Sequence, residues 1–197
     1  MPATLEYCFD FISPYTYLAA TQVEDLAKRT GAKLVYRPVF LGGIFKETGN
    51  QAPMNIPKKA AYLPGDVQAW AGHYGVPLTF PASFPFNTVR AMRGALVAER
   101  EGKLPAYTKA GFKSAWVDGK DLGDLEVLAE VATSAGLDRE KFLAAIEEPG
   151  IKEALKERTA EAVERGAFGL PTFFVGGEMF WGNDRLVLVE ELLKKSK

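Results

Sequence analysis

The chain has 197 residues, of which 47% are apolar and 25% charged, and its formal net charge is −1. This composition favours one well-packed domain, with or without an insertion, and excludes a disordered chain, while the interleaved charges lack the basic patch typical of nucleic-acid binding. No apolar stretch reaches the roughly 18 residues of a membrane span. The single cysteine, Cys8, excludes an internal disulfide. The N-terminal MPATLEYC lacks the features of a secretory signal, so we expect a reducing, cytoplasmic location.

The beginning of the chain predicts a strand, a helix and a second strand. The apolar, aromatic segment LEYCFDF (5–11) is typical of a buried strand. Ser13 is a good helix N-cap, and Pro14 suits the first helical position. The segment KLVYRPVFL (33–41) predicts the second strand, in which Pro38 indicates a bulge or a sheet edge. Two strands joined in this way normally pair in parallel, so we expect a right-handed βαβ unit.

The middle of the chain divides into a loop-rich segment and a helical block. Residues 42–86 are rich in glycine and proline, and they predict loops with one short helix at about 66–75. Residues 87–165 show helical periodicity in five segments, separated by short turns built on Gly, Pro and Asp. We therefore expect a helical insertion after the βαβ unit.

The end of the chain predicts a hairpin and a helix. The runs TFFV and EMFW are split by Gly176-Gly177, which indicates a hairpin, and NDRLVLVEELLKKSK predicts a final helix capped by Asn183 or Asp184. The complete order predicts an α/β fold, a thioredoxin-like βαβ…ββα domain with a large inserted all-helical domain. The expected boundaries are 1–45 and 166–197 for the thioredoxin-like domain, and 46–165 for the insertion, including a loop at 46–62.

At the strand-to-helix corner DFISPYTYL, a thioredoxin-like protein would carry a Cys-x-x-Cys pair. Here the four residues are Ser13, Pro14, Tyr15 and Thr16. A serine at this position normally just caps the helix through its hydroxyl. The same helix N-terminus also favours anions, and a hydroxyl beside it can stabilise a thiolate. Because serine cannot form a mixed disulfide, the sulfur would have to come from a ligand.

Two further motifs offer contacts for a peptide-like ligand. In FGLPTFFV, the structural explanation of Pro171 is a tight cis turn, and the functional one is that Leu170 presents its backbone N–H and C=O to an extended ligand. In FWGNDR, Asp184 and Arg185 either cap the last helix and pair locally, or bind the ammonium and carboxylate groups of a ligand.

Other polar residues carry weaker signals. The loop TGNQAPMNIPKK is polar enough to be simply solvated, but Asn50 and Lys59 would contact a ligand if the loop folds over Ser13. His73 and Cys8 are the only residues of their types, so the sequence predicts no metal cluster and no Cys–His dyad. Neither a G-x-S-x-G elbow nor a glycine-rich nucleotide motif is present.

Taken together, DFISPYTYL, GIFKETGNQAPMNIPKKAAYL, AMR (91–93), RGAFGLPTFFV and MFWGNDRL resemble the 2-hydroxychromene-2-carboxylate isomerase family. This family is kin to the kappa-class glutathione transferases within the DsbA-like thioredoxin group, and the resemblance covers essentially the whole chain. It implies that Ser13 is catalytic and hydrogen-bonds the sulfur of glutathione. The glutathione-binding residues that it implies are Asn50, Lys59, Leu170, Pro171, Asn183, Asp184 and Arg185. The substrate-binding residues that we expect are Phe84, Phe86, Asn87, Arg90 and Trp181.

The resemblance also implies the reaction. The family interconverts 2-hydroxychromene-2-carboxylate and trans-o-hydroxybenzylidenepyruvate in naphthalene-type degradation, with glutathione as a cofactor that is not consumed. The thiolate would add to the unsaturated carbon, the new single bond would rotate, and elimination would release glutathione. Lys59 or Arg90 would hold the carboxylate of this small aromatic substrate. The family's homodimer would let Arg185 reach the glutathione of the other subunit.

Two alternatives to the isomerase stay open. The first is a kappa-type transferase or peroxidase, which uses the same thiolate but consumes glutathione. The second is a non-enzymatic DsbA-like module that binds an extended peptide. A disulfide oxidoreductase is excluded, because neither Ser13 nor Thr16 can carry the electrons.

Overall fold

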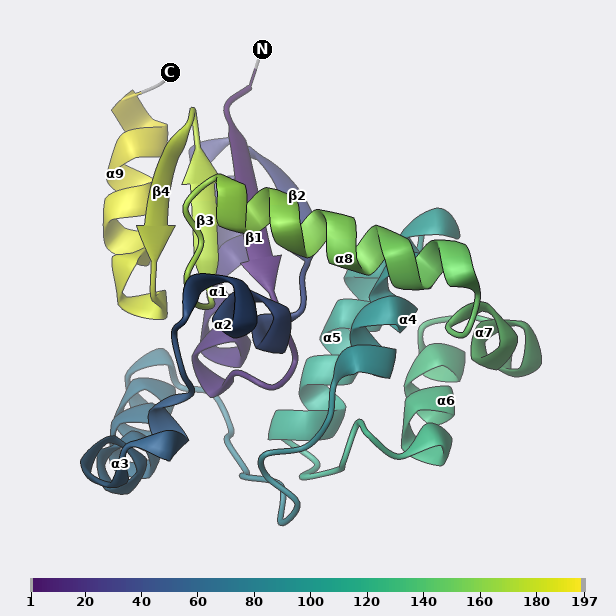
Figure 1. Cartoon of the computed structure of the whole chain (residues 1–197). Coiled ribbons are helices and arrows are strands. Elements are labelled where there is room, and N and C mark those ends of the chain that lie inside the picture. Colours follow the sequence, from purple (N-terminus) through teal and green to yellow (C-terminus); the bar gives the residue numbers. More distant parts are fainter. Residues whose placement is uncertain (1, 196–197) are drawn as a thin grey trace.

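The computed structural model describes residues 2–195 and contains a four-stranded sheet beside a block of helices (Figure 1). The sheet has the order β2-β1-β3-β4, in which β1 is parallel to β2 and antiparallel to β3, and β3 is antiparallel to β4. The elements of this part are β1 (Thr4–Phe9), α1 (Pro14–Thr30), β2 (Lys33–Pro38), β3 (Thr172–Val175), β4 (Glu178–Trp181) and α9 (Leu186–Lys195). This is the predicted thioredoxin-like βαβ…ββα order. Met1, Ser196 and Lys197, which belong to the predicted domain and final helix, lie outside the described residues.

Both strands of the βαβ unit are shorter than predicted. β1 ends at Phe9 and β2 ends at Pro38, whereas the sequence predicted strands to residues 11 and 41. The chain leaves the sheet because the carboxylate of Asp10 accepts hydrogen bonds from the backbone N–H groups of Ile12 (3.1 Å) and Leu41 (2.8 Å). The predicted edge position of Pro38 is confirmed, since β2 lies at the edge of the sheet.

The prediction of loops with one short helix for residues 42–86 was wrong. This segment contains α2 (Leu41–Thr48), the 3₁₀ turn η1 (Pro53–Asn55) and the 18-residue helix α3 (Pro57–Tyr74). Glycine in α2 is required by close packing: a Cβ on Gly43 would lie 3.0 Å from the methyl group of Thr159. In α3, Pro57 occupies the first turn, where no N–H is needed, and the helix continues through Pro64 because its inner face is buried.

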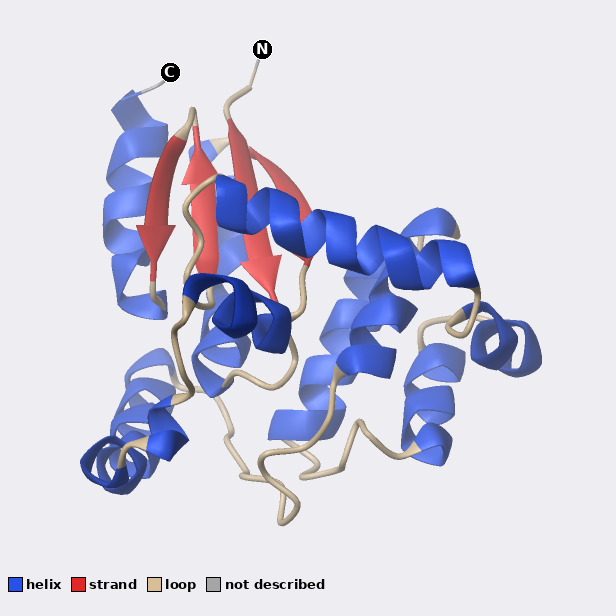
Figure 2. Ribbon diagram, viewed as in Figure 1, coloured by secondary structure: helices blue, strands red, loops and turns tan. Residues whose placement is uncertain are grey.

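The five predicted helical segments between residues 87 and 165 are confirmed. They are α4 (Val89–Arg100), α5 (Leu104–Trp116), α6 (Leu125–Ser134), α7 (Arg139–Ala145) and α8 (Pro149–Glu164). Figure 2 shows this block beyond one end of the sheet, and α8 packs against α2, α4 and β2 on its way back to β3. No helix within residues 2–195 is long and apolar enough to cross a bilayer.

The core continues from the sheet into the helical block. Phe9 at the end of β1 and Phe11 in the following turn both pack against Phe112 of α5, with ring centroids 5.9 and 4.9 Å apart. Phe11 also packs edge-on against Tyr107 at 5.9 Å. These aromatic contacts fix the turn that leads into α1. The division into two domains at residues 45/46 and 165/166 stays a prediction.

The start of the last helix differs from the prediction. Asn183 and Asp184 do not cap α9 but form the 3₁₀ turn η2 (Asn183–Arg185), which follows Gly182 and precedes Leu186. The side chain of Asn183 is buried against Tyr74 of α3, whose hydroxyl donates to the backbone oxygen of Asn183 at 3.2 Å. Because this side chain faces α3, it does not reach the amides of α9.

Candidate active site

Ser13 lies at the corner between β1 and α1, and it caps α1 as predicted. Its Oγ accepts a hydrogen bond from the backbone N–H of Thr16 at 3.2 Å, and its backbone oxygen accepts from the N–H groups of Thr16 and Tyr17, both at 3.1 Å. The residue is 7% exposed. Ser13 is therefore held firmly by hydrogen bonds, and a small part of it reaches the surface beside the N-terminus of the 17-residue helix α1.

The corner meets the segment that precedes β3. The hydroxyl of Ser13 donates to the backbone oxygen of Leu170 at 3.4 Å, and the Leu170-Pro171 peptide bond is cis, as expected. An O–H···O bond normally measures about 2.7–2.8 Å, so this one is weak and the hydroxyl can exchange it for a better acceptor. The structure thus brings together Ser13 and Leu170, the two residues that the sequence motifs placed on either side of a ligand.

Asn50 lies beside the same segment. Its Nδ2 donates to the backbone oxygen of Phe168 at 2.8 Å, and the ring of Phe168 packs against Trp181 with centroids 4.9 Å apart. Phe168 is 38% exposed and Trp181 48%. Gly169 makes this contact possible, because a Cβ there would lie 2.7 Å from Nε1 of Trp181. The loop after α2, the Leu170-Pro171 turn and the end of β4 therefore lie side by side.

The remaining polar candidates lie on α3 and η2. Lys59 is exposed in the first turn of α3, where its charge adds to the positive end of the helix dipole. Asp184 and Arg185 form an ion pair with each other in η2, and each side chain is about half exposed. η2 packs against α1, and the charge of Asp184 acts on Tyr15 in the first turn of that helix. This ion pair confirms the local pairing that the sequence offered as one of the two interpretations of FWGNDR.

Phe84 and Phe86 belong to an aromatic cluster under the corner. Both rings pack against Trp116, with centroids 5.6 and 6.3 Å away. The indole Nε1 of Trp116 donates to the backbone oxygen of Phe11 at 2.8 Å. Phe86 is buried, whereas Phe84 is partly exposed. The cluster therefore supports the turn before Ser13, and Phe84 can also contact a ligand.

Asn87 and Arg90 have local partners. Oδ1 of Asn87 accepts from the backbone N–H of Val89 at 2.9 Å, at the start of α4. Arg90 pairs with Glu147 at 2.9 Å, and hydrogen bonds from Lys152 and Arg90 lower the pKa of Glu147 to about 2. The hydrogen bond of Asn87 and the ion pair of Arg90 lie outside the Ser13 corner, and the expected role of these residues in substrate binding stays a prediction.

Sequence reasoning missed Asp10 and Tyr15. Asp10 is completely buried, and this burial raises the pKa of its carboxyl group to about 6. The hydroxyl of Tyr15 donates to Oδ2 of Asp66 at 2.6 Å, which ties the start of α1 to α3. Burial, assisted by the hydrogen bond to Asp66, raises the pKa of Tyr15. A carboxylate inside the apolar run CFDFI was the available signal for Asp10, since such groups are rarely buried without partners.

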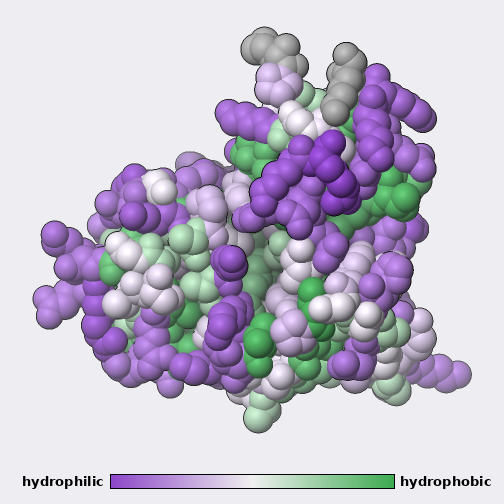
Figure 3. Space-filling view, turned by 180° about the vertical axis from the view of Figure 1, so that it is seen from behind, coloured by the Kyte–Doolittle hydropathy of each residue, from purple (hydrophilic) through white to green (hydrophobic). Residues whose placement is uncertain are grey.

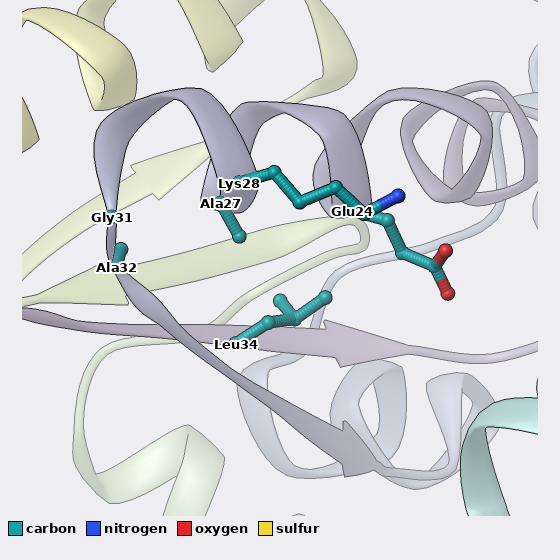
Figure 4. Close-up of a pocket in the computed structure, with 6 residues that line it drawn as sticks. All are labelled: Glu24, Ala27, Lys28, Gly31, Ala32 and Leu34. Carbon is teal, nitrogen blue, oxygen red and sulfur yellow. The ribbon is translucent and has the colours of Figure 1, made fainter.

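Other surface features carry no comparable chemistry. A hollow between α1 and β2 is lined by Glu24, Ala27, Lys28, Gly31, Ala32 and Leu34 (Figure 4). It lies at the opposite end of α1 from Ser13, about 20 Å away at 1.5 Å per residue. Figure 3 shows the back of the molecule, where apolar side chains are visible in a hollow between the helical block and the sheet-bearing part. Within the described residues, no group of three His, Cys, Asp or Glu side chains is placed to hold a metal ion.

Comparisons with known proteins agree with this architecture. Residues 4–194 match the family model of the DSBA-like thioredoxin domain. The chain is 36% identical over 195 residues to the 2-hydroxychromene-2-carboxylate isomerase of Sphingobium xenophagum, covering 98% of this chain and 99% of that protein. It is 30% identical over 207 residues to glutathione S-transferase kappa 1 of Homo sapiens, covering 98% and 92%.

The solved structures give the same result. A selenomethionine structure of 2-hydroxychromene-2-carboxylate isomerase matches with a TM-score of 0.89 at 35% identity, covering 98% of this chain and 95% of that one. Sequence and structure therefore agree over nearly the full length of both proteins. The chain belongs to the DSBA-like thioredoxin domain family and, within it, to the group of 2-hydroxychromene-2-carboxylate isomerases and kappa-class glutathione transferases.

Proposed function

We propose that this protein is a glutathione-dependent isomerase that interconverts 2-hydroxychromene-2-carboxylate and trans-o-hydroxybenzylidenepyruvate. The observation that carries the proposal is the weak 3.4 Å hydrogen bond between Ser13 and Leu170, which leaves a hydroxyl donor available at a helix N-terminus. Relatives that bear the isomerase name are 36–37% identical over most of the chain, which favours the isomerase over the transferase.

Glutathione fits the polar groups around the corner. The hydroxyl of Ser13 would donate to the sulfur, and the amides of α1 would favour its charged form and lower the pKa of the thiol. The backbone of Leu170 would align the peptide. Asn50 could donate to the ligand in place of the oxygen of Phe168, while Lys59 and the N-terminus of α3 would attract a terminal carboxylate.

The Asp184–Arg185 pair suits the γ-glutamyl group, which carries an ammonium and a carboxylate on one carbon. An ion pair that is half exposed contributes little stability, so exchanging it for two ligand charges costs little. Asn183 lies in the same turn but is buried against Tyr74, which makes it a support for this turn. Pro171 and Trp181 would shape the walls of the site on either side of Leu170.

When bound, glutathione supplies a thiolate that adds reversibly to the unsaturated carbon of the substrate, so that the bond can rotate. The residues of the chain would bind and orient glutathione and the substrate, and would exclude water from the site. Ser13 would hold the sulfur at the mouth of the corner, and Phe84 of the aromatic cluster would offer a flat apolar surface to the substrate ring. The substrate carboxylate would be held by Lys59, or by Arg90 if it exchanges its partner Glu147.

The deciding experiment compares turnover of the hydroxychromene carboxylate, with glutathione present, between the wild type and Ser13→Ala. We expect a loss of roughly 10²-fold, the effect of removing one donor to a reacting anion. Ser114→Ala is the matched control, because Ser114 is a buried serine of α5. Unchanged turnover in Ser13→Ala would exclude the proposed role.

The kappa-class transferase remains the second candidate, supported by the 30% identity to the human protein of that name. The two functions differ in stoichiometry, because a transferase consumes one glutathione per electrophile and an isomerase consumes none. Calorimetry that detects no glutathione binding would favour the peptide-binding module. We also propose a cytoplasmic homodimer that acts in aromatic catabolism, and sedimentation of the purified protein tests its subunit number.

A further inference from the structure

Asp10 is a buried carboxylate that connects three segments of the chain. It follows β1 and is 0% exposed. Its Oδ1 accepts from the backbone N–H of Ile12 at 3.1 Å, and its Oδ2 accepts from the backbone N–H of Leu41 at 2.8 Å. The hydroxyl of Thr88 and the backbone N–H of Phe11 lie near enough to favour the ionised form of this carboxyl group. All of these partners are neutral donors.

Asp10 interacts with the first residues of two helices. Phe40 occupies the N-cap position of α2 and has no side-chain hydrogen bond to offer, so Asp10 supplies the missing acceptor from another segment. Thr88 occupies the N-cap position of α4, but its side chain does not cap that helix and instead favours the ionised form of Asp10. One carboxylate thus binds the starts of two helices to the end of β1.

The same residue fixes the turn that carries Ser13. The backbone N–H of Ser13 donates to the backbone oxygen of Asp10 at 3.3 Å, and Ile12 donates to its side chain. α2 leads into the loop that carries Asn50, and Thr88 directly follows the segment that carries Phe84 and Phe86. Three walls of the candidate site therefore have their common attachment at Asp10.

We propose that Asp10 is a positioning residue, whose ionised carboxylate holds the Ser13 turn against the starts of α2 and α4 and so aligns the Ser13 hydroxyl with the thiol. The part of this proposal that concerns the thiol rests on the proposed function. The anchoring of the three segments does not, and it can be measured without any ligand.

The charge matters because each carboxylate oxygen already accepts a hydrogen bond from a backbone N–H, Oδ1 from Ile12 and Oδ2 from Leu41. A proton on either oxygen would confront an N–H or O–H that already points at it. The other charged groups on the elements around Asp10 either form ion pairs elsewhere or lie at the end of their helix that is remote from Asp10. They are Glu6 on β1 (with Arg37 and Arg165), Lys46 and Glu47 in the last turn of α2, Arg90 and Arg93 on α4 (with Glu147), and Arg158 on α8 (with Glu99).

The test compares Asp10→Asn with Glu6→Gln, a variant that removes the charge of a partly buried carboxylate on β1. Amide hydrogen exchange of the ligand-free proteins should accelerate at least 10-fold at Ile12 and Leu41 in Asp10→Asn, but not in Glu6→Gln. With glutathione bound, ultraviolet titration of the thiolate should show a raised thiol pKa in Asp10→Asn. Its kcat should fall at least 10-fold with a smaller change in KM for the substrate.

Thr88→Val provides a milder variant if Asp10→Asn does not fold. Losing the Thr88 donor removes a group that stabilises the charged form, so the acidic limb of the kcat/KM profile should move up by at least about 0.5 pH unit. Unchanged exchange at Ile12 and Leu41 would overturn the anchoring, and an unchanged thiol pKa and pH profile would overturn the alignment. Failure of the wild type to bind glutathione would instead count against the proposed function, while the exchange measurement still decides the anchoring.

Discussion

Trp116→Phe tests whether the aromatic cluster holds the Ser13 corner in place. Trp116 is the last residue of α5 and is completely buried. Its indole makes two kinds of contact: the 2.8 Å hydrogen bond from Nε1 to the oxygen of Phe11, and ring packing against Phe80, Phe84 and Phe86. Phenylalanine keeps most of the packing but removes the donor and part of the ring.

The magnitude follows from these two losses. A buried carbonyl left without its donor costs about 1–3 kcal/mol, and the space left by the smaller ring adds about 1 kcal/mol. We therefore expect the free energy of unfolding to fall by about 2–4 kcal/mol. Because Phe11 lies two residues before Ser13, we also expect weaker binding of glutathione.

Urea denaturation followed by circular dichroism measures the loss, and calorimetry measures the binding. Trp70→Phe is the matched control, since Trp70 on α3 is only partly buried and packs against His73 and Tyr74. It should lose less than about 1 kcal/mol. Equal losses in the two variants, or a loss below about 1 kcal/mol in Trp116→Phe, would refute the reasoning from the buried carbonyl.

The remaining predictions concern pH and two glycines. Burial raises the pKa of Asp10 from 3.8 to about 6, so the stabilisation from its protonated form is complete below pH 3.8 and is lost as the pH rises through 6. Urea titrations from pH 4 to 7 should therefore show the wild type losing up to about 3 kcal/mol of unfolding free energy that Asp10→Asn, whatever its own stability, does not lose over the same range. The hydrogen bond from Arg165 lowers the pKa of Glu6, so the stabilisation from its ionised form is complete above pH 4.5 and is lost at lower pH. If the pH curves of unfolding free energy for Asp10→Asn or Glu6→Gln run parallel to that of the wild type, the corresponding sign is wrong. Gly111→Ala should lower the free energy of unfolding by about 1–3 kcal/mol, because its Cβ would lie 2.6 Å from the ring of Phe11. Gly72→Ala has open space around its Cβ and should raise the free energy of unfolding by about 0.5–1 kcal/mol. Thermal denaturation that ranks the two variants the other way would contradict this account of the packing.

The order of elements was predictable because its signals are local. Ser13 and Pro14 mark the start of α1, and Gly176-Gly177 marks the hairpin, through preferences of single residues for single backbone positions. The same kind of signal predicted the meeting of Ser13 with Leu170, once the βαβ…ββα order was recognised. The bond between them joins residues 157 positions apart, but the fold fixes where each of them lies.

The missed features depend on contacts between distant segments. Gly43 and Pro64 argue against helices on propensity alone, yet α2 and α3 form because tertiary packing against Thr159 and within the core outweighs that penalty. From the sequence, Arg90 could be expected to bind the substrate carboxylate. In the structure its guanidinium pairs with Glu147, 57 positions away. Neither effect has a signature within a window of ten or twenty residues.

Asp10 shows why a stability argument alone does not explain this corner. A fully buried carboxylate is costly near neutral pH, because burial disfavours its charged form. An amide would avoid the charge but has one oxygen, so its N–H₂ would face the backbone N–H of either Ile12 or Leu41, which bond to different oxygens of the carboxylate. Only a carboxylate accepts from both at once, and that double attachment brings the Ser13 turn and α2 into a single arrangement. The charge of Asp10 therefore serves, in the proposal made above, to hold the turn that carries Ser13 against the start of α2.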